Sequence, residues 1–208
     1  MITDGLNPLT VLLFAGAVLT AGALVVVYAI ARFTKREPLG RMALRILLGG
    51  TGVYVVLLLI DSVTSRSRVL EPGQEKHICE IDCHLAYSVA AAKSESLAGG
   101  LVRRVVTVKV RFDEETISSR RSKTATLQPN TRYVALVDDA GNQYSGSTDG
   151  LKRTLIPGES YTTDIAFEVP MKATGLRLIL RNADAETQVI IGHENSFFHA
   201  KTMFRLPG

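Results

Sequence analysis

The longest uncharged segment of the chain lies near its N-terminus and limits the possible folds most strongly. From Gly5 to Ala31 there are 27 consecutive residues without Asp, Glu, Lys or Arg, and most of them are apolar. A helix needs about 20 apolar residues to cross a bilayer. A cleaved signal peptide has a basic segment ahead of a shorter apolar run, but no Lys or Arg precedes Arg32. The sequence therefore predicts a retained transmembrane helix over about residues 9–31.

A second apolar stretch predicts a second span over about residues 42–60. It contains Arg45 near its start, and an arginine there can extend its side chain toward the headgroups. Three glycines between residues 49 and 52 provide a smooth surface that lets two helices pack closely in lipid. We therefore expect residues 1–61 to form a transmembrane hairpin.

The basic residues around the two spans predict how this hairpin is oriented. Most of them lie between the spans, whereas the N-terminal flank has Asp4 and no basic residue. Because positively charged loops stay in the cytoplasm, the connecting loop is expected there. Both termini and residues 62–208 are then extracytoplasmic, on the outer side of a bacterial cell (inner) membrane. The connecting basic residues are Arg32, Lys35, Arg36 and Arg41.

The remainder of the chain has the composition of a folded domain with a mixed surface. The formal net charge of the whole chain is +4, too small to indicate a nucleic-acid partner. The polar stretch over residues 62–76 contains Pro72-Gly73 and is expected to be a linker. Residues 77–208 are expected to form the extracytoplasmic domain.

Apolar and polar residues alternate through this domain, which is typical of half-buried strands. Turn sequences separate the strands, including the residues 138–142 between two of them. Seven or eight short strands without a long helix predict an all-β antiparallel sandwich behind the hairpin. The expected strands are Leu85–Ala92, Val106–Phe112, Tyr133–Val137, a strand resuming at Tyr144, Ile165–Val169, Leu176–Leu180, Thr187–Ile191 and Met203–Leu206.

Three sequence segments in this domain resemble a known family. The order RYVALVDDAGNQY, LIPGESYTTDIAFEVP and GLRLIL resembles a bacterial immunoglobulin-like family of unknown function, whose relatives include small secreted mycobacterial antigens. The resemblance covers roughly Leu85 to Leu206. It implies an extracytoplasmic sandwich on a lipid or membrane anchor and no enzyme activity.

One short segment carries the residues with the most distinctive chemistry. Both cysteines, Cys79 and Cys83, lie within eight residues that also contain two of the four histidines. A disulfide between them is the first interpretation, because extracytoplasmic compartments are oxidising. The alternative is a copper or redox site made of thiolate, imidazole and thioether groups. Its ligands would be Cys79, Cys83, His84, His199 and Met203.

Two other sites remain open for the same residues. Cys79-x-x-x-Cys83-His84 is one residue longer than the haem-attachment motif, and two cysteines with two histidines match the ligand count of zinc. No arrangement typical of an enzyme is present, so we expect a non-enzymatic binding domain without a cofactor. Its partners would be the lipid bilayer and an envelope or extracytoplasmic protein.

Overall fold

A computed structural model describes residues 2–3, 8–79, 83–117, 122, 124–182 and 184–207. The chain divides into two compact units, which are described separately. The first contains residues 1–4, 66–184 and 201–208, and the second contains residues 5–65 and 185–200. Residues 185–200, which connect the last two strands of the chain, thus belong to the same unit as the N-terminal helices.

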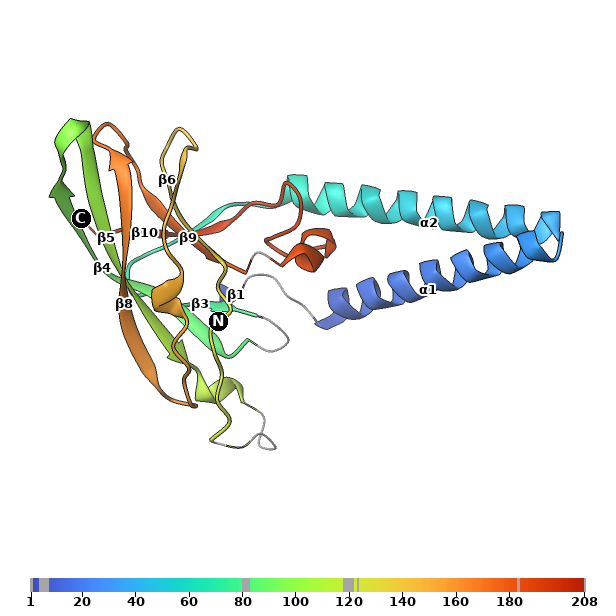
Figure 1. Ribbon diagram of the computed structural model, residues 1–208, viewed down its shortest axis with the longest axis horizontal. Helices are drawn as coiled ribbons and strands as arrows, with labels where there is room; N and C mark the ends of the chain where they lie inside the picture. Colours follow the sequence, from blue (N-terminus) through green and yellow to red (C-terminus); the bar gives the residue numbers. More distant parts are fainter. Residues whose placement is uncertain are drawn as a thin grey trace. The chain divides into compact units, whose positions relative to one another are not determined.

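The second unit contains two long apolar helices, α1 (Pro8–Phe33) and α2 (Glu37–Thr64). Figure 1 shows them as an antiparallel pair, joined by the short connection before Glu37. The helices are closest near this connection, where Gly40 of α2 lies beside Ala31 and Tyr28 of α1. Most of their large apolar side chains are exposed. Both helices are long and apolar enough to cross a membrane, and each extends beyond its predicted span.

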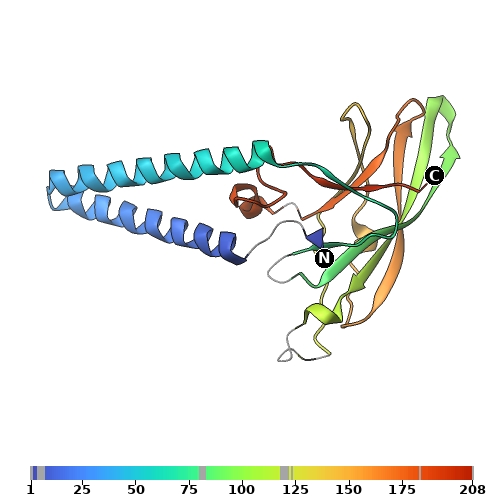
Figure 2. The same cartoon turned by 180° about the vertical axis from the view of Figure 1, so that it is seen from behind.

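The first unit is a β-sandwich of two five-stranded sheets (Figures 1 and 2). One sheet has the order β1 (Ile2–Thr3), β3 (Lys76–Ile78), β4 (Leu85–Ser96), β5 (Leu101–Phe112), β8 (Ser160–Pro170). The other has the order β2 (Arg68–Leu70), β10 (Thr202–Arg205), β9 (Arg177–Arg181), β6 (Tyr133–Val137), β7 (Gln143–Ser145). Short 3₁₀ helices lie at Ala98–Gly100, Glu114–Thr116, Asp149–Leu151 and Ala185–Val189.

The apolar residues of the alternating strands fill the space between the sheets, as the period of two requires. In β5 every second residue from Val106 to Phe112 is fully buried, and Phe167 of β8 is buried beside them. Lys76 is also fully buried, and its Nζ donates a hydrogen bond to the backbone oxygen of Leu180 in the opposite sheet at 3.0 Å. This lysine therefore links the two sheets through the core.

The predicted β-sandwich is confirmed, but several details of the prediction are wrong. The sheets are mixed rather than fully antiparallel, because β1 pairs with β3 and β2 pairs with β10 in the parallel sense. Three short strands precede Leu85, and one of them, β2, lies in the expected linker. The expected strand Thr187–Ile191 is instead largely the 3₁₀ helix Ala185–Val189.

The last difference has a physical reason in the second unit. The backbone oxygen of Val189 accepts a hydrogen bond from the Tyr54 hydroxyl of α2 at 2.6 Å. The backbone amide of Gly192 donates to the Asp61 carboxylate at 2.8 Å. These backbone groups therefore bond to helix side chains rather than to a neighbouring strand. β-propensity in the sequence alone could not reveal this competition.

Candidate functional site

The two cysteines are joined in a disulfide between Cys79, directly after β3, and Cys83, shortly before β4. Cys79 is buried. A disulfide leaves no thiolate for a metal ion, which argues against the copper alternative. The bond closes a loop at the β3–β4 connection and so limits the conformations of that connection in the unfolded chain.

The other three residues of the predicted metal site have separate surroundings. His84 Nδ1 lies 2.6 Å from the Thr116 hydroxyl, and its ring stacks on Phe112. His199 belongs to the unit of the helices, where its Nδ1 lies 2.7 Å from the backbone oxygen of Ala200. Met203 lies in β10 of the sandwich. Within the part of the chain that the structure describes, no group of three or more His, Cys, Asp or Glu residues could hold a metal ion, so no copper site is indicated.

A charged cluster close to the disulfide was not predicted from the sequence. It consists of Glu75, His77, Arg111 and Asp113. The Arg111 guanidinium donates two hydrogen bonds to Glu75, from Nε to Oε1 at 3.0 Å and from Nη2 to Oε2 at 2.6 Å. Its Nη1 lies 3.1 Å from Asp113 Oδ1. His77 Nε2 lies 3.0 Å from Asp113 Oδ2, and both of these side chains are buried.

The strand register explains why these residues meet. His77 of β3 pairs with Ala86 of β4, and Ala86 pairs with Arg111 of β5. The three side chains therefore lie in one row on one face of the sheet, with the smallest in the middle. Asp113 follows Arg111 by two residues and continues on that face. Long side chains from β3 and β5 can consequently interact across the intervening strand.

The cluster changes the acidity of its carboxyl groups. The hydrogen bond from Arg111 lowers the pKa of Glu75 below its ordinary value, although burial acts in the opposite direction. Burial acts to raise the pKa of Asp113, but hydrogen bonds from His77, Arg111 and the Glu115 amide outweigh it and lower the pKa. Both carboxylates are thus stabilised in their charged form, as a structural ion-pair network requires.

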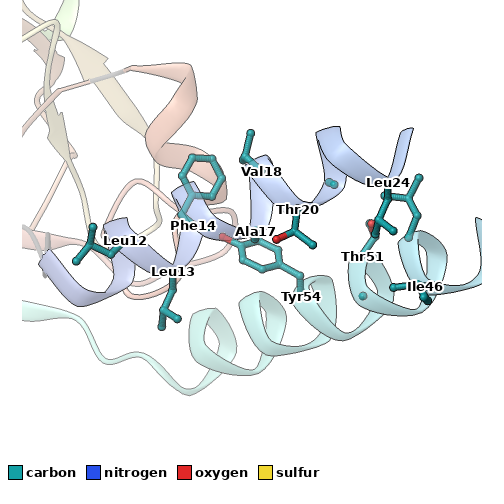
Figure 3. A pocket seen from close by; sticks show the side chains of 14 residues that line it. Leu12, Leu13, Phe14, Ala17, Val18, Thr20, Leu24, Ile46, Thr51 and Tyr54 are labelled. Atoms are coloured by element: carbon teal, nitrogen blue, oxygen red, sulfur yellow. The ribbon is translucent and has the colours of Figure 1, made fainter. Parts of the chain in front are cut away.

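The helices enclose a second feature, an apolar groove of about 550 Å³. Figure 3 shows its lining side chains, with Phe14 and Tyr54 close together and Thr20 and Thr51 further along the helices. The rings of Phe14 and Tyr54 have centroids 6.4 Å apart. The wall includes small residues from both helices, namely Gly16, Ala17 and Ala21 from α1 and Gly50 from α2. Its chemistry suits hydrocarbon rather than a polar ligand.

The described residues define a protein of two parts, a pair of apolar helices and a β-sandwich of two mixed sheets. No protein-family model matches the sequence, and no curated protein matches it. Among solved structures, the chain is similar to MPT63, a secreted protein from Mycobacterium tuberculosis, at 12% identity and a TM-score of 0.44. That match covers 68% of this chain and 99% of the other.

A second similar structure is an uncharacterized β-sandwich protein from Clostridium difficile 630. The identity is 12% and the TM-score is 0.39. The match covers 69% of this chain and 96% of that protein.

Proposed function

We propose that this chain is a non-enzymatic protein of the bacterial cell membrane, with an extracytoplasmic, immunoglobulin-like sandwich that binds another protein. The observation that carries the proposal is the pair of helices. They are 26 and 28 residues long, and their large apolar side chains are mostly exposed. A soluble protein would bury such surfaces. A bilayer removes them from water without any further partner.

Two observations support the proposed orientation. The N-terminal strand β1 pairs with β3 of the sandwich, so the start of α1 and the chain after α2 are joined to the same unit. A two-helix hairpin that crosses the bilayer twice satisfies this arrangement. The disulfide between Cys79 and Cys83 is typical of an oxidising compartment.

Cysteine labelling tests the membrane proposal directly. The native cysteines are paired, so a Thr34→Cys variant in the helix connection and a Met171→Cys variant in the sandwich each introduce one free thiol. We expect a membrane-impermeant maleimide to label Met171→Cys in spheroplasts and to label Thr34→Cys only after lysis. The reverse pattern, or extraction of the protein by carbonate, would contradict the proposal.

The edge of strand β8 is the proposed contact surface for the protein partner. β8 is the last strand of its sheet and pairs with β5 along eleven residues. The backbone bonds from Phe112 N to Glu159 O and from Met171 N to Gly100 O, each 2.9 Å, fix the alternation of this ladder. The amides of Thr162, Asp164, Ala166 and Glu168 therefore point away from β5.

An extended segment of a partner can add to such an edge as a further strand. The side chains of Thr162, Asp164, Ala166 and Glu168 are exposed along it. Pro170, which has no amide hydrogen, ends the strand at an outward-facing position. The edge thus offers outward amides and carbonyls in a polar setting, which suits a reversible protein contact.

A proline substitution tests this surface. Ala166→Pro removes one outward amide hydrogen while leaving the bonds to β5 in place. With a photo-crosslinking residue at Thr162, we expect a discrete adduct in cells that weakens at least five-fold in the Ala166→Pro background. The same crosslinker at Ala140, in the β6–β7 turn, is the control. An adduct that forms equally from both positions, or that is unaffected by proline, would contradict the edge as the contact surface.

A further inference from the structure

The connection between β9 and β10, residues 185–200, lies along the C-terminal part of α2, as Figure 2 shows. Three hydrogen bonds hold it there. Two are those from Tyr54 to Val189 and from Gly192 to Asp61. The third runs from the Ala200 amide to the Ser65 hydroxyl at 2.7 Å. Tyr54 and Asp61 lie in α2 and Ser65 directly follows it. From Tyr54 to Ser65 the chain advances eleven positions, about 16 Å along the helix axis.

The connection buries polar residues and exposes apolar ones, which is the opposite of a loop in water. The four consecutive polar residues from His193 to Ser196 are at most 5% exposed. The next two residues are Phe197, 50% exposed, and Phe198, 79% exposed. Soluble proteins bury phenylalanine and expose polar groups. The reversed arrangement indicates that the surroundings of this loop are apolar.

The backbone conformation of the connection keeps the two phenylalanine side chains exposed. Phe198 has a φ of 63°, a left-handed conformation that is unfavourable for a residue with a Cβ. The adjoining turn is held by the bond from Phe197 N to Gln188 O at 3.1 Å and by the bond from Ser196 N to His193 O at 2.9 Å. The side chains are therefore presented outward by a defined turn.

The depth of residues 185–200 in the bilayer follows from their contacts with α2. This step rests on the membrane function proposed above. Asp61 is the first charged residue after the apolar segment 46–60, which places it near the outer headgroups. Tyr54 lies seven residues earlier, about 10 Å deeper along the helix. Its bond to Val189 then satisfies a backbone oxygen where water is scarce. We propose that residues 185–200 enter the outer leaflet and that Phe197 and Phe198 contact lipid there.

Phenylalanine is one of the apolar side chains that segments lying in the membrane interface insert at the boundary between headgroups and acyl chains, so the chemistry of this pair fits lipid. The consequence is a third membrane contact, made by the connection between β9 and β10 rather than by a spanning helix. A loop with this role would hold β9 and β10 to the bilayer in addition to the chain that follows α2.

Tryptophan fluorescence tests the proposal with little background, because the natural chain contains no tryptophan. The full-length Phe198→Trp variant is reconstituted in phosphatidylcholine vesicles with or without brominated acyl chains. Leu19→Trp, in the middle of α1 and 74% exposed, reports on the helices. Met171→Trp, 62% exposed in the sandwich, is the control in water.

We expect Phe198→Trp to emit at a shorter wavelength than Met171→Trp and to lose at least half of its emission in brominated vesicles. Quenching of Leu19→Trp together with unquenched, water-like emission from Phe198→Trp would overturn the loop proposal while leaving the helices in the membrane. If Leu19→Trp is also unquenched, the membrane function itself fails. Phe197→Trp repeats the measurement if the left-handed position does not accept tryptophan.

Discussion

Asp113 provides the sharpest test of how the charged cluster stabilises the sandwich. Its carboxylate contacts His77, Arg111 and the Glu115 amide, and its side chain is only 9% exposed. Asp113→Asn preserves the size of the side chain and can still accept the bond from the Glu115 amide, because asparagine is a good cap. The substitution therefore removes mainly the charge.

The expected loss follows from the two contacts to ring and guanidinium nitrogens. A hydrogen bond to a charged group contributes about 1.5–3 kcal/mol, against about 0.5–1.5 kcal/mol for a neutral bond. With asparagine the contact to His77 becomes one between neutral groups, whereas the bond from Arg111 still involves the charged guanidinium. The free energy of unfolding should therefore fall by about 1–2 kcal/mol. Arg111 keeps its two bonds to Glu75, so the loss should not exceed this range. For a domain of this size the melting temperature should fall by about 5 °C.

The assay is thermal unfolding of the full-length protein in detergent, followed by near-ultraviolet circular dichroism of its tyrosines. Asp164→Asn is the matched control, because Asp164 is exposed and accepts a bond from the Thr107 hydroxyl. We expect the control to melt within about 2 °C of the natural protein, as most surface substitutions do. Equal melting temperatures for Asp113→Asn and the natural protein would refute the assignment of a stabilising role to the cluster.

Three further predictions concern the sandwich. Replacing Cys79 and Cys83 together by serine should lower the free energy of unfolding by about 2 kcal/mol, because the unfolded chain regains the entropy that closing a five-residue loop removes. Denaturant titration with and without reductant checks this. The pKa values of Glu75 and Asp113 are lowered from ordinary values of 4.5 and 3.8, so their stabilisation is complete above those values and is lost as the pH falls through the lower folded values. Melting temperatures between pH 7 and 2 should show this loss, and it should be smaller in Asp113→Asn. Gly146→Ala would place a methyl carbon 2.5 Å from the buried Phe167 ring of β8, so the free energy of unfolding should fall by about 1–3 kcal/mol. An unchanged denaturation midpoint would contradict this.

Local sequence patterns predicted the elements whose partners are close in the chain or whose environment is uniform. The alternation in β5 and β8 requires one buried face, so both strands were predictable from the sequence. The long apolar runs likewise predicted α1 and α2. The neighbouring strands β6 and β7 follow from the turn between them, because a short connection leaves an antiparallel pair as the direct solution.

The charged cluster was beyond such reasoning because its members meet only through strand register. Glu75 and Asp113 are far apart in the sequence, and each alone has the pattern of an ordinary surface residue. The pairing of His77 with Ala86 and of Ala86 with Arg111 brings them together. The same residues could not have been grouped without knowing that β4 lies between β3 and β5.

The sequence by itself determined the apolar helices, most of the long strands and the closeness of Cys79 and Cys83 along the chain. These features depend on interactions between near neighbours or on the contrast between apolar and polar faces. The tertiary structure decided the parallel pairs β1–β3 and β2–β10, the charged cluster and the place of residues 185–200 beside α2. Each of these depends on contacts between distant segments, which compete with local propensity and become visible only when the whole chain is folded.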